Sequence, residues 1–418
     1  MKKSLFALAA TTAFAGAAQA QSSVTVYGLM DLGYVGYNTR VATGSTTAGQ
    51  PVNKTTGNAF SSSGESTSRL GFKGSEDLGG GASAFFTVEI GLTPNSAQVA
   101  STSGTQNRQA FVGLKKNGLG QFALGTQYTL IHNAVAATDP GQANNISGNI
   151  IYPAVTEGAG SNENSNGSAY TVRTNNQLSV NSETFAGFTG NAMLVMNNKN
   201  SNETITGTTT SITTGGTNNQ NGWGLGLNYT WNKLYATANY QALTSKQAAQ
   251  TTVATATTYA TYFLAGAPAV GYTGGSSAPG TNVQDNQWYV AATYDFGILK
   301  AYAQYINRKV SAQQNSGYYV SRSGEQIGVR SYITPTIEAW ASGGLGRYTG
   351  FGSNSANLTA WQIGSNYWLS KRTNLYAIYG QTGTSNVSTP TTINGSTVNI
   401  NPASTNISNY AVGVRHTF

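Results

Sequence analysis

The chain of 418 residues contains no cysteine, two histidines and few charged residues. Without cysteine, disulfide scaffolds, thiolate zinc sites and thiol nucleophiles are excluded. Charged residues make up 9% of the sequence, against roughly 25% in a soluble domain. A surface with so little charge either faces something other than water or is solvated by neutral polar groups. His132 and His416 are too few for a histidine metal or general-base centre, so we expect no metal and no cofactor.

A long apolar run is also absent once the N-terminus is set aside. A membrane helix needs about 20 apolar residues in a row, and none follows residue 20. The N-terminus combines two lysines, the apolar stretch Leu5–Gly16 and the small-x-small sequence Ala18-Gln19-Ala20, which is typical of a cleaved secretory signal. The sequence therefore predicts a signal peptide over residues 1–20 and a mature domain over residues 21–418. The mature chain is then either soluble and exported, or it crosses a membrane as strands.

Apolar and polar residues alternate with a period of two in many segments of the mature chain. In residues 223–231 the odd-numbered positions carry Trp, Leu, Leu, Tyr and Trp, and the even-numbered positions carry Gly, Gly, Asn and Thr. We call each such set of alternate positions a parity. A strand points successive side chains to opposite faces, so one face is apolar and the other is small and polar. The same pattern returns in segments 234–241, 287–296, 326–333 and 361–369.

A soluble β-sandwich also alternates, but three features favour membrane strands. Aromatic residues stand at both ends of the apolar faces, where a membrane strand meets its two interfaces. Segments of about 10 tilted residues span the apolar band of about 25 Å in an outer-membrane barrel. The other face of each strand carries small and polar residues and no second set of apolar side chains. Such a face suits a water-filled lumen better than the dry core of a sandwich.

The connections between these strands alternate in length. Short links with Gly, Asn, Asp or Pro, the residues of tight turns, are 76–80, 117–120, 182–184, 231–233, 295–297, 334–336 and 370–373. Long segments rich in Ser, Thr, Asn and Gly are 39–65, 94–106, 131–168, 199–221, 245–285, 311–321, 349–357 and 384–407. Short turns on one side and long loops on the other are the outer-membrane pattern. The sequence therefore predicts an all-β fold, a transmembrane antiparallel barrel of 16 strands with short periplasmic turns and long extracellular loops.

The C-terminal strand is amphipathic and ends on an aromatic residue. Tyr410, Val412, Val414, His416 and Phe418 share one parity. This ending resembles the signal by which the barrel assembly machinery recognises outer-membrane proteins. We expect Tyr410, His416 and Phe418 to provide that signal.

Four segments resemble the trimeric general porins of Gram-negative bacteria. They are Val24–Asp31, Ser68–Gly79, Arg108–Leu114 and Gly413–Phe418, the last of which is similar to the β-proteobacterial branch. The resemblance implies a 16-stranded barrel and a homotrimer among the lipids of the outer membrane. It also implies passive diffusion of small hydrophilic solutes and a third loop that folds inward to constrict the channel.

By its motifs the resemblance places a basic wall at the constriction, formed by Arg69, Arg108 and Arg173 with Lys73 beside them. Alternation supports a lumen-facing Arg69, whereas Arg108 has the parity of apolar neighbours. A lipid-facing Arg near the midplane costs about 2 to 4 kcal/mol, which favours the lumen for Arg108 as well. Other charges with lumen parity are Lys300, Arg330 and Arg415.

The third long loop, residues 131–168, is the expected constriction, and its acids are Asp139, Glu157 and Glu163. These carboxylates either face the arginines and create a transverse field or remain solvated loop charges. The acidic motif that is usual in this loop of the family is missing here. At the fifth strand, Gly125-Thr126 replaces the Gly-Arg of the family.

These features predict a water-filled diffusion channel that prefers anions. The formal charge is +8, and it becomes +6 when the two signal-peptide lysines are removed. The alternative is a substrate-specific channel for sugars or organic anions, with a stacking track of tyrosines at Tyr27, Tyr128, Tyr152, Tyr235, Tyr289 and Tyr302. An enzyme is not expected, because neither histidine has a serine or an aspartate at the sequence spacing of a known catalytic motif. The positive charges form no cluster that suits nucleic acid.

Overall fold

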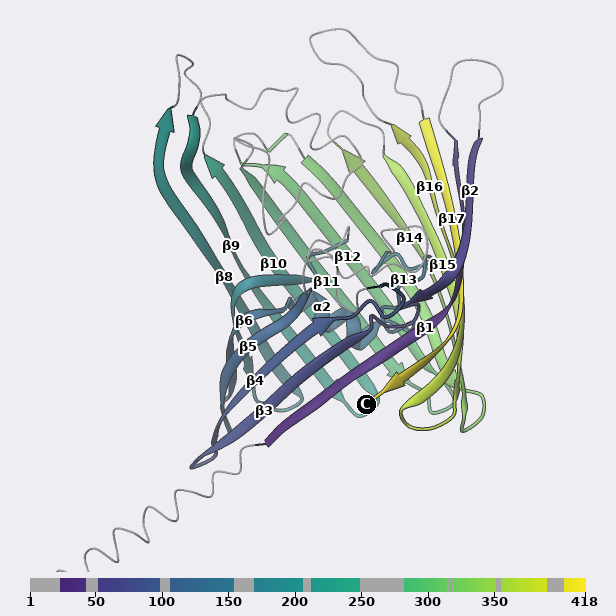
Figure 1. Ribbon diagram of the computed structural model, residues 1–418, viewed down its shortest axis with the longest axis horizontal. Helices are drawn as coiled ribbons and strands as arrows, with labels where there is room; N and C mark the ends of the chain where they lie inside the picture. Colours follow the sequence, from purple (N-terminus) through teal and green to yellow (C-terminus); the bar gives the residue numbers. More distant parts are fainter. Residues whose placement is uncertain are drawn as a thin grey trace, which may run out of the picture.

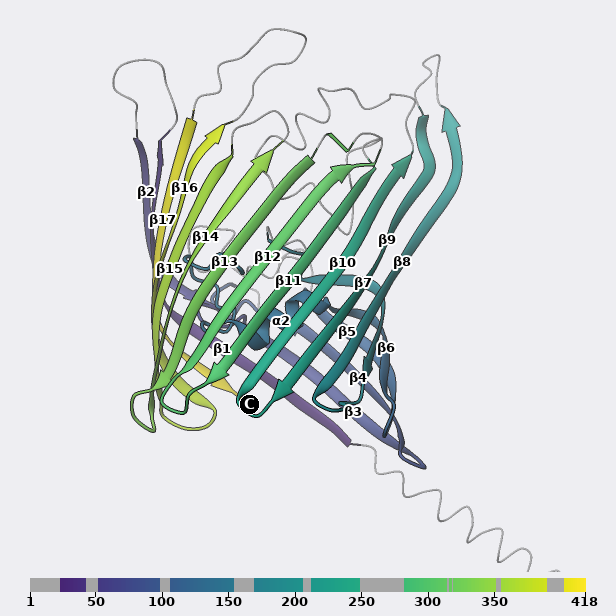
Figure 2. The same cartoon turned by 180° about the vertical axis from the view of Figure 1, so that it is seen from behind.

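The computed structural model describes residues 23–42, 52–97, 106–153, 169–205, 212–248, 282–313, 316–317, 319–350, 355–388 and 402–418. They form one antiparallel sheet that curls into a barrel, with a short helix and the chain after it inside the barrel (Figures 1 and 2). Among these residues no helix is long and apolar enough to span a membrane. The strands are β1 (Ser23–Ala42), β2 (Val52–Ser62), β3 (Arg69–Gly79), β4 (Ala82–Gly91), β5 (Asn107–Lys116), β6 (Gly120–Tyr128), β7 (Arg173–Ser182), β8 (Phe188–Ile205), β9 (Ile212–Trp231), β10 (Leu234–Ala248), β11 (Val283–Asp295), β12 (Lys300–Ala312), β13 (Tyr319–Tyr332), β14 (Ile337–Gly350), β15 (Ala356–Trp368), β16 (Thr373–Ser388) and β17 (Pro402–Thr417).

The 17 strands occupy 16 positions around the barrel. On one side β1 pairs with β17 from Leu29 to Ala42 and closes the sheet. On its other side β1 pairs with β3 below Leu29 and with β2 above Leu32. Strands β2 and β3 are therefore two halves of one barrel strand, interrupted by residues 63–68. The predicted 16-stranded antiparallel barrel is confirmed, with a break in its second strand.

The alternation in the sequence sets the two faces of the wall. Large apolar side chains such as Leu225 and Val412 are exposed on the outside. Side chains of the other parity, such as Gln241 and Asn409, are buried inside. A barrel in lipid needs this apolar outer band. Tyr410, Val412, Val414, His416 and Phe418 all lie on the exposed face, as their parity predicts.

The seven predicted short turns fall between consecutive strands, as expected. Three of the expected long loops were wrong in extent. Segment 39–65 contains the end of β1 and all of β2, segment 199–221 contains the end of β8 and the start of β9, and segment 384–407 contains the end of β16 and the start of β17. Asparagines pair across β8 and β9, for example Asn221 Nδ2 with Asn198 Oδ1 at 2.9 Å. Such cross-strand pairs stabilise a sheet without an apolar face, so polar strands continue beyond the membrane.

The wall is low on one side of the barrel (Figure 1). Strands β3 to β7 have 9 to 11 residues, whereas β8 to β10 have 15 to 20. Nine to eleven residues at about 3.3 Å each and a tilt near 40° cover about 23 to 28 Å, against about 25 Å for the apolar band. This part of the wall therefore reaches little further than the apolar band itself.

The third loop begins with helix α2 (Leu130–Thr138) inside the barrel. Thr129 caps the helix, because its side chain accepts from His132 N at 3.3 Å. Ile131 and Val135 are fully buried and belong to a core that includes Tyr289 of β11 and Ile306 of β12. The apolar face of the helix thus holds the loop against the far wall, which confirms the expected inward fold.

Candidate functional site

A row of buried glutamines fastens the third loop to the inner wall. Gln287 accepts from Thr171 N at 2.7 Å. Gln326 donates to Asp139 Oδ1 at 3.0 Å. The row, with one glutamine on each of five strands, comprises Gln241, Gln287, Gln304, Gln326 and Gln362. The lumen parity was interpreted as facing water, but at these positions it faces the loop. The recurring Gln at mid-strand was the available signal.

Arg108 reaches the lumen because β5 contains a bulge. The register passes from Glu89↔Gln109 to Ile90↔Asn107, which leaves Arg108 as the extra residue. A bulge re-aims a side chain. Arg108 is 0% exposed, whereas Val112, which has the same parity, is 58% exposed. Simple alternation gave an ambiguous result for Arg108, and the bulge explains why.

Three arginines from three strands meet around Glu89 and Tyr128. Arg108 Nε donates to Glu89 Oε1 at 2.7 Å, and Arg108 Nη2 donates to Tyr128 OH at 2.6 Å. Arg69 Nη1 lies 3.8 Å from Glu89 Oε1. The guanidinium of Arg173 lies 5.4 Å from the centre of the Tyr128 ring. The sequence predicted the arginines but not Glu89. The available signal was alternation, because Glu89 follows Val88 in β4 and so points to the other face; the structure buries Glu89 and exposes Val88.

The three arginines differ in exposure. The Arg69 side chain is 21% exposed, whereas Arg108 and Arg173 are 0% and 4% exposed. Arg69 is therefore the guanidinium of the three that presents surface to solvent. On the same strand, Lys73 Nζ lies 5.3 Å from the centre of the Tyr27 ring.

His132 of α2 lies against this arginine cluster. Its ring centre is 4.3 Å from that of Tyr128, and its Nδ1 is 3.0 Å from Tyr170 OH. Burial lowers the pKa of His132 well below its usual 6.5, and the charges of the three wall arginines lower it further. The imidazole is therefore neutral at pH 7.

The predicted loop acid Asp139 lies against the β13 wall. It is 3% exposed, and its carboxylate accepts from Ala143 N at 2.7 Å and Asn149 Nδ2 at 2.9 Å, as well as from Gln326. Burial raises its pKa, against the opposing effect of these hydrogen bonds. Asp139 thus serves to tie the loop together. The other two predicted acids, Glu157 and Glu163, lie outside the described residues.

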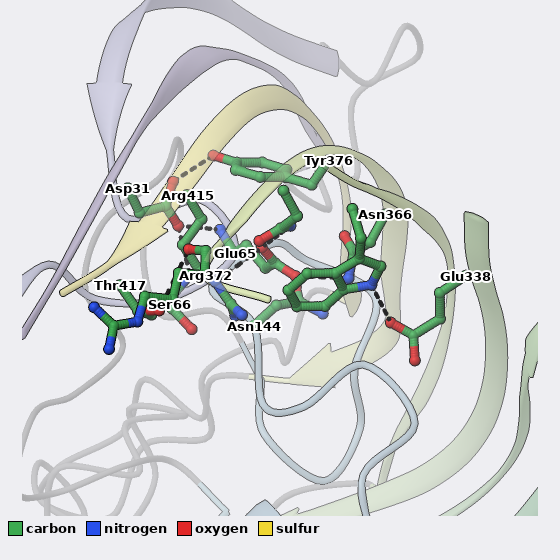
Figure 3. Close-up of polar contacts among 12 residues, drawn as sticks. Asp31, Glu65, Ser66, Asn144, Glu338, Asn366, Arg372, Tyr376, Arg415 and Thr417 are labelled. Atoms are coloured by element: carbon green, nitrogen blue, oxygen red, sulfur yellow. Dashed lines mark hydrogen bonds and ion pairs between the residues drawn. The ribbon is translucent and has the colours of Figure 1, made fainter. Parts of the chain in front are cut away.

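A second polar cluster fills the break between β2 and β3 (Figure 3). Asp31 accepts from Glu65 N at 2.8 Å, Ser66 N at 2.6 Å and Tyr376 OH at 2.6 Å. Glu65 in turn lies 3.6 Å from Arg415 Nε. The inward segment 63–68 is therefore held by charged and polar groups of β1, β16 and β17, and Arg415 has a carboxylate beside it.

Two further predicted lumen charges lie on β12 and β13. Arg330 forms an ion pair with Glu338, with Nη2 donating to Oε2 at 2.6 Å, and its Nη1 donates to Pro140 O at 2.7 Å. Arg330 thus anchors the third loop. Lys300 Nζ lies 5.3 Å from the centre of the Tyr302 ring. Within the described ranges, no group of three or more His, Asp or Glu side chains is placed to hold a metal ion.

Comparison with known proteins gives the barrel a family. Residues 7–387 match the family of Gram-negative porins. The chain belongs to this porin family. Its membership and its barrel of strands make it a protein of the bacterial outer membrane, as the sequence predicted.

Two curated porins show sequence similarity over part of their length. An outer membrane porin protein of Bordetella pertussis is 36% identical over 152 residues, which cover 34% of this chain and 39% of the relative. Outer membrane porin protein 32 of Delftia acidovorans is 34% identical over 188 residues, which cover 45% of this chain and 48% of the relative. The matched regions thus span less than half of each relative.

The fold also matches solved porin structures. An anion-selective porin from Comamonas acidovorans has a TM-score of 0.61 at 20% identity, covering 95% of this chain and all 100% of that chain. An OmpF porin from Salmonella typhi, solved with daunomycin, has a TM-score of 0.53 at 16% identity, covering 94% of this chain and 97% of that chain. At these identities the likeness concerns the fold.

Proposed function

We propose that this porin is a general diffusion channel that lets small hydrophilic solutes and ions pass and prefers anions. The observation that carries the proposal is the convergence of Arg69, Arg108 and Arg173 beside the inward-folded loop, with the Arg69 side chain partly exposed. Fixed positive charge at a narrow, low-dielectric passage attracts anions and raises their local concentration. The Comamonas acidovorans porin with this fold is described as anion-selective, which supports the proposal.

Reversal potentials across planar bilayers test this function. In a KCl gradient the wild-type channel is expected to show anion preference, and Arg69→Glu is expected to shift the reversal potential toward cations. Lys246→Glu, at an exposed position on β10, is the matched control and is expected to change little. A clear cation preference of the wild type contradicts the proposal. Glu157→Gln and Glu163→Gln are expected to increase anion preference if these acids face the arginines.

A substrate-specific channel has less support. Tyr152 and Tyr289 belong to the buried core under the third loop, and Tyr27 OH donates to Glu89 at 3.1 Å. Tyrosines engaged in this way do not form an open stacking track. Saturable block of the current by a sugar or an organic anion would favour this alternative, whereas linear conductance supports diffusion. Family membership favours a channel over an enzyme.

The proposed assembly is a homotrimer of the kind that porins form. The low wall of β3 to β7 supports it, because strands of 9 to 11 residues barely cross the apolar band and a neighbouring subunit would cover their rim. An oligomer that resists SDS and dissociates on heating is the expected result on a gel. The signal peptide of residues 1–20 lies outside the described residues and stays a prediction, as does recognition by the assembly machinery.

A further inference from the structure

Two strands of the barrel each have an open edge above the low wall of β3 to β7. Among the described strands, β1 is the one that pairs with β2, from Val52 to Ser62. Strand β8 pairs with β7 only from Asn191 to Val195, whereas its pairing with β9 continues to Ile205. In the described part of the chain, one side of β2 and one side of residues 196–205 of β8 therefore lack a neighbouring strand.

The two open edges stand at opposite ends of the low wall. In Figure 1, β2 rises on the right and β8 on the left, with the short strands between them. Strand β2 is exposed on both faces, because every residue from Val52 to Phe60 except Gly57 is exposed. An open edge presents unpaired backbone N–H and C=O groups to any other strand, and proteins usually cover it. Both edges are therefore suited to accept a further strand.

We propose that β2 of one subunit pairs with the upper part of β8 of the next subunit, so that strand pairing crosses the subunit interface. The inference rests on the proposed homotrimer. In a closed ring of identical subunits, each contact joins two different surfaces of the chain. When the low walls face the centre of the ring, the β2 side of one barrel meets the β8 side of its neighbour.

The direction and the faces of the two strands fit this pairing. Strand β2 runs from the side of the long loops toward the low wall, whereas β8 starts at a short turn and rises toward the long loops. The pair is therefore antiparallel, as are all other pairs of this sheet. Because the strand order runs the same way round each barrel, β8 of the neighbour follows β2 with both lumen faces on the same side.

An exposed apolar side chain on each strand sets the register. Phe60 of β2 is 83% exposed and lies opposite Tyr34 on the outer face. Met196 of β8 is 60% exposed and has the outward parity of Leu194. Each lies at the lower end of its open edge, next to the low wall. Placing Phe60 opposite Met196 of the partner subunit covers both, and a thioether beside an aromatic ring is a favourable contact.

This register places polar residues opposite each other further up. Asn58 lies opposite Asn198 of the partner subunit, and Thr56 lies opposite Asn200 of the partner subunit. Cross-strand pairs of polar side chains stabilise a sheet, and such pairs already join β8 to β9, where Asn221 Nδ2 donates to Asn198 Oδ1 at 2.9 Å. The proposed contact thus continues the polar sheet that β8 and β9 form.

Disulfide cross-linking of the full-length porin tests the pairing, and the absence of cysteine from the sequence leaves no background. Residues opposite each other in an antiparallel pair have Cα atoms about 4.5 to 5.5 Å apart, which is within disulfide range. The double variant Asn58→Cys/Asn198→Cys is expected to give covalent dimers and trimers on a boiled, non-reducing gel. Within one subunit the two strands are five strand spacings of about 4.8 Å apart, so a disulfide can form only between subunits.

Two matched variants separate strand pairing from simple proximity. Asn58→Cys/Lys199→Cys places the second cysteine on the opposite face of β8 and is expected to cross-link severalfold less. Asn58→Cys/Lys309→Cys, with the second cysteine at an exposed position near the upper end of β12, is expected to give only chance cross-links between oligomers. A maximum at Asn200→Cys in place of Asn198→Cys supports the pairing in a register shifted by two residues.

Two results would overturn the proposal. They are equal cross-linking with Asn198→Cys and Lys199→Cys, and cross-linking of the Asn198→Cys variant no stronger than that of the Lys309→Cys control. Unheated gels of the same samples separate this failure from a failure of the assembly. An SDS-resistant oligomer without cross-links overturns the strand pairing alone, whereas a monomer in mild detergent overturns the homotrimer as well.

Discussion

Arg108 and Glu89 form a buried ion pair inside the barrel, with Arg108 Nε 2.7 Å from Glu89 Oε1. The pair exists because a bulge in β5 turns Arg108 inward at the point where Glu89 of β4 faces it. Arg69 lies 3.8 Å from the same carboxylate. Glu89 therefore lowers the repulsion among the arginines while it moderates their positive field.

Glu89→Gln is expected to increase anion preference and to lower stability. The variant keeps the size of the side chain but removes the negative charge that faces Arg69 and Arg108. Breaking a buried ion pair costs about 3 to 5 kcal/mol, with a lower figure expected here because the lumen is partly wet. Reversal potentials in a salt gradient and the temperature of oligomer dissociation measure the two effects.

Glu183→Gln provides the control for the Glu89 variant. Glu183 pairs with Lys115 at 3.6 Å, and the side chains are 42% and 43% exposed. Exposed pairs contribute about 0 to 1 kcal/mol, so both readouts are expected to stay near the wild type. Equal selectivity in Glu89→Gln and the wild type would show that Glu89 does not set the field of the pore.

His132 is expected to make the fold sensitive to acid. Its pKa in the folded protein is depressed by burial and by the wall arginines. Below about pH 6.5 the unfolded chain therefore binds one more proton than the folded protein, and stability falls as the pH falls toward the folded-state pKa. The loss is about 1.4 kcal/mol per pH unit in that window.

Thermal dissociation at a series of pH values from 7.5 to about 4.5 measures this loss. Carboxylates also titrate in this range, so the difference between the wild type and His132→Gln isolates the histidine. His416→Gln, at an exposed position on β17, is the control and is expected to follow the wild type. Parallel pH profiles of the wild type and His132→Gln would contradict the prediction.

Phe418→Ala is expected to reduce the amount of porin in the outer membrane. Phe418 pairs with Gly28 through both backbone hydrogen bonds at 3.1 Å, and its ring covers the side of Gly28. If the terminal ring is a recognition signal, export in cells falls severalfold while refolding into detergent changes little. Val414→Ala, on the same exposed face, is the control. Equal losses in cells and in detergent would indicate a purely structural role.

The barrel was predictable from the sequence because a membrane strand must place apolar side chains on its lipid-facing side and can place polar ones on the other side. Alternation set the faces of segments such as 223–231, and turn residues such as Asn232 and Gly297 set the hairpins, both with positive φ. The strand ends were not predictable, because β8 and β9 continue into water on Asn, Ser and Thr side chains that also suit loops. Outside the membrane both strands and loops are polar, so the sequence pattern no longer shows where a strand ends.

The site was predictable in part. Motifs pointed to Arg69, Arg108 and Arg173, which the fold brings together, but a one-residue bulge cannot be derived from parity. Helix α2 was missed because residues 131–168 were interpreted as one long polar loop, although Ile131, Ala134 and Val135 have the spacing of a helical face. For Asp139 the sequence left open whether it faces the arginines or is a solvated loop charge, and its three-dimensional neighbours Asn149 and Gln326 show that it ties the loop to β13.

Gly380→Ala is expected to loosen the third loop and so to widen and destabilise the channel. A Cβ at Gly380 of β16 would overlap the carbonyl oxygen of Ser147, and Ser147 Oγ also donates to Asn409 at 2.8 Å. The wall and the loop backbone therefore touch here without room for a methyl group. Gly343 of β14 is the matched control, since the nearest atom to its Cβ position is Ala360 O at 4.0 Å.

Single-channel recordings measure the consequence of the Gly380 substitution. A displaced loop is expected to give larger open-channel noise, higher conductance and a weaker anion preference, because the loop no longer narrows the bore beside Arg69. Gly343→Ala is expected to match the wild type in all three. Wild-type noise and conductance in Gly380→Ala would mean that this contact does not hold the loop in place.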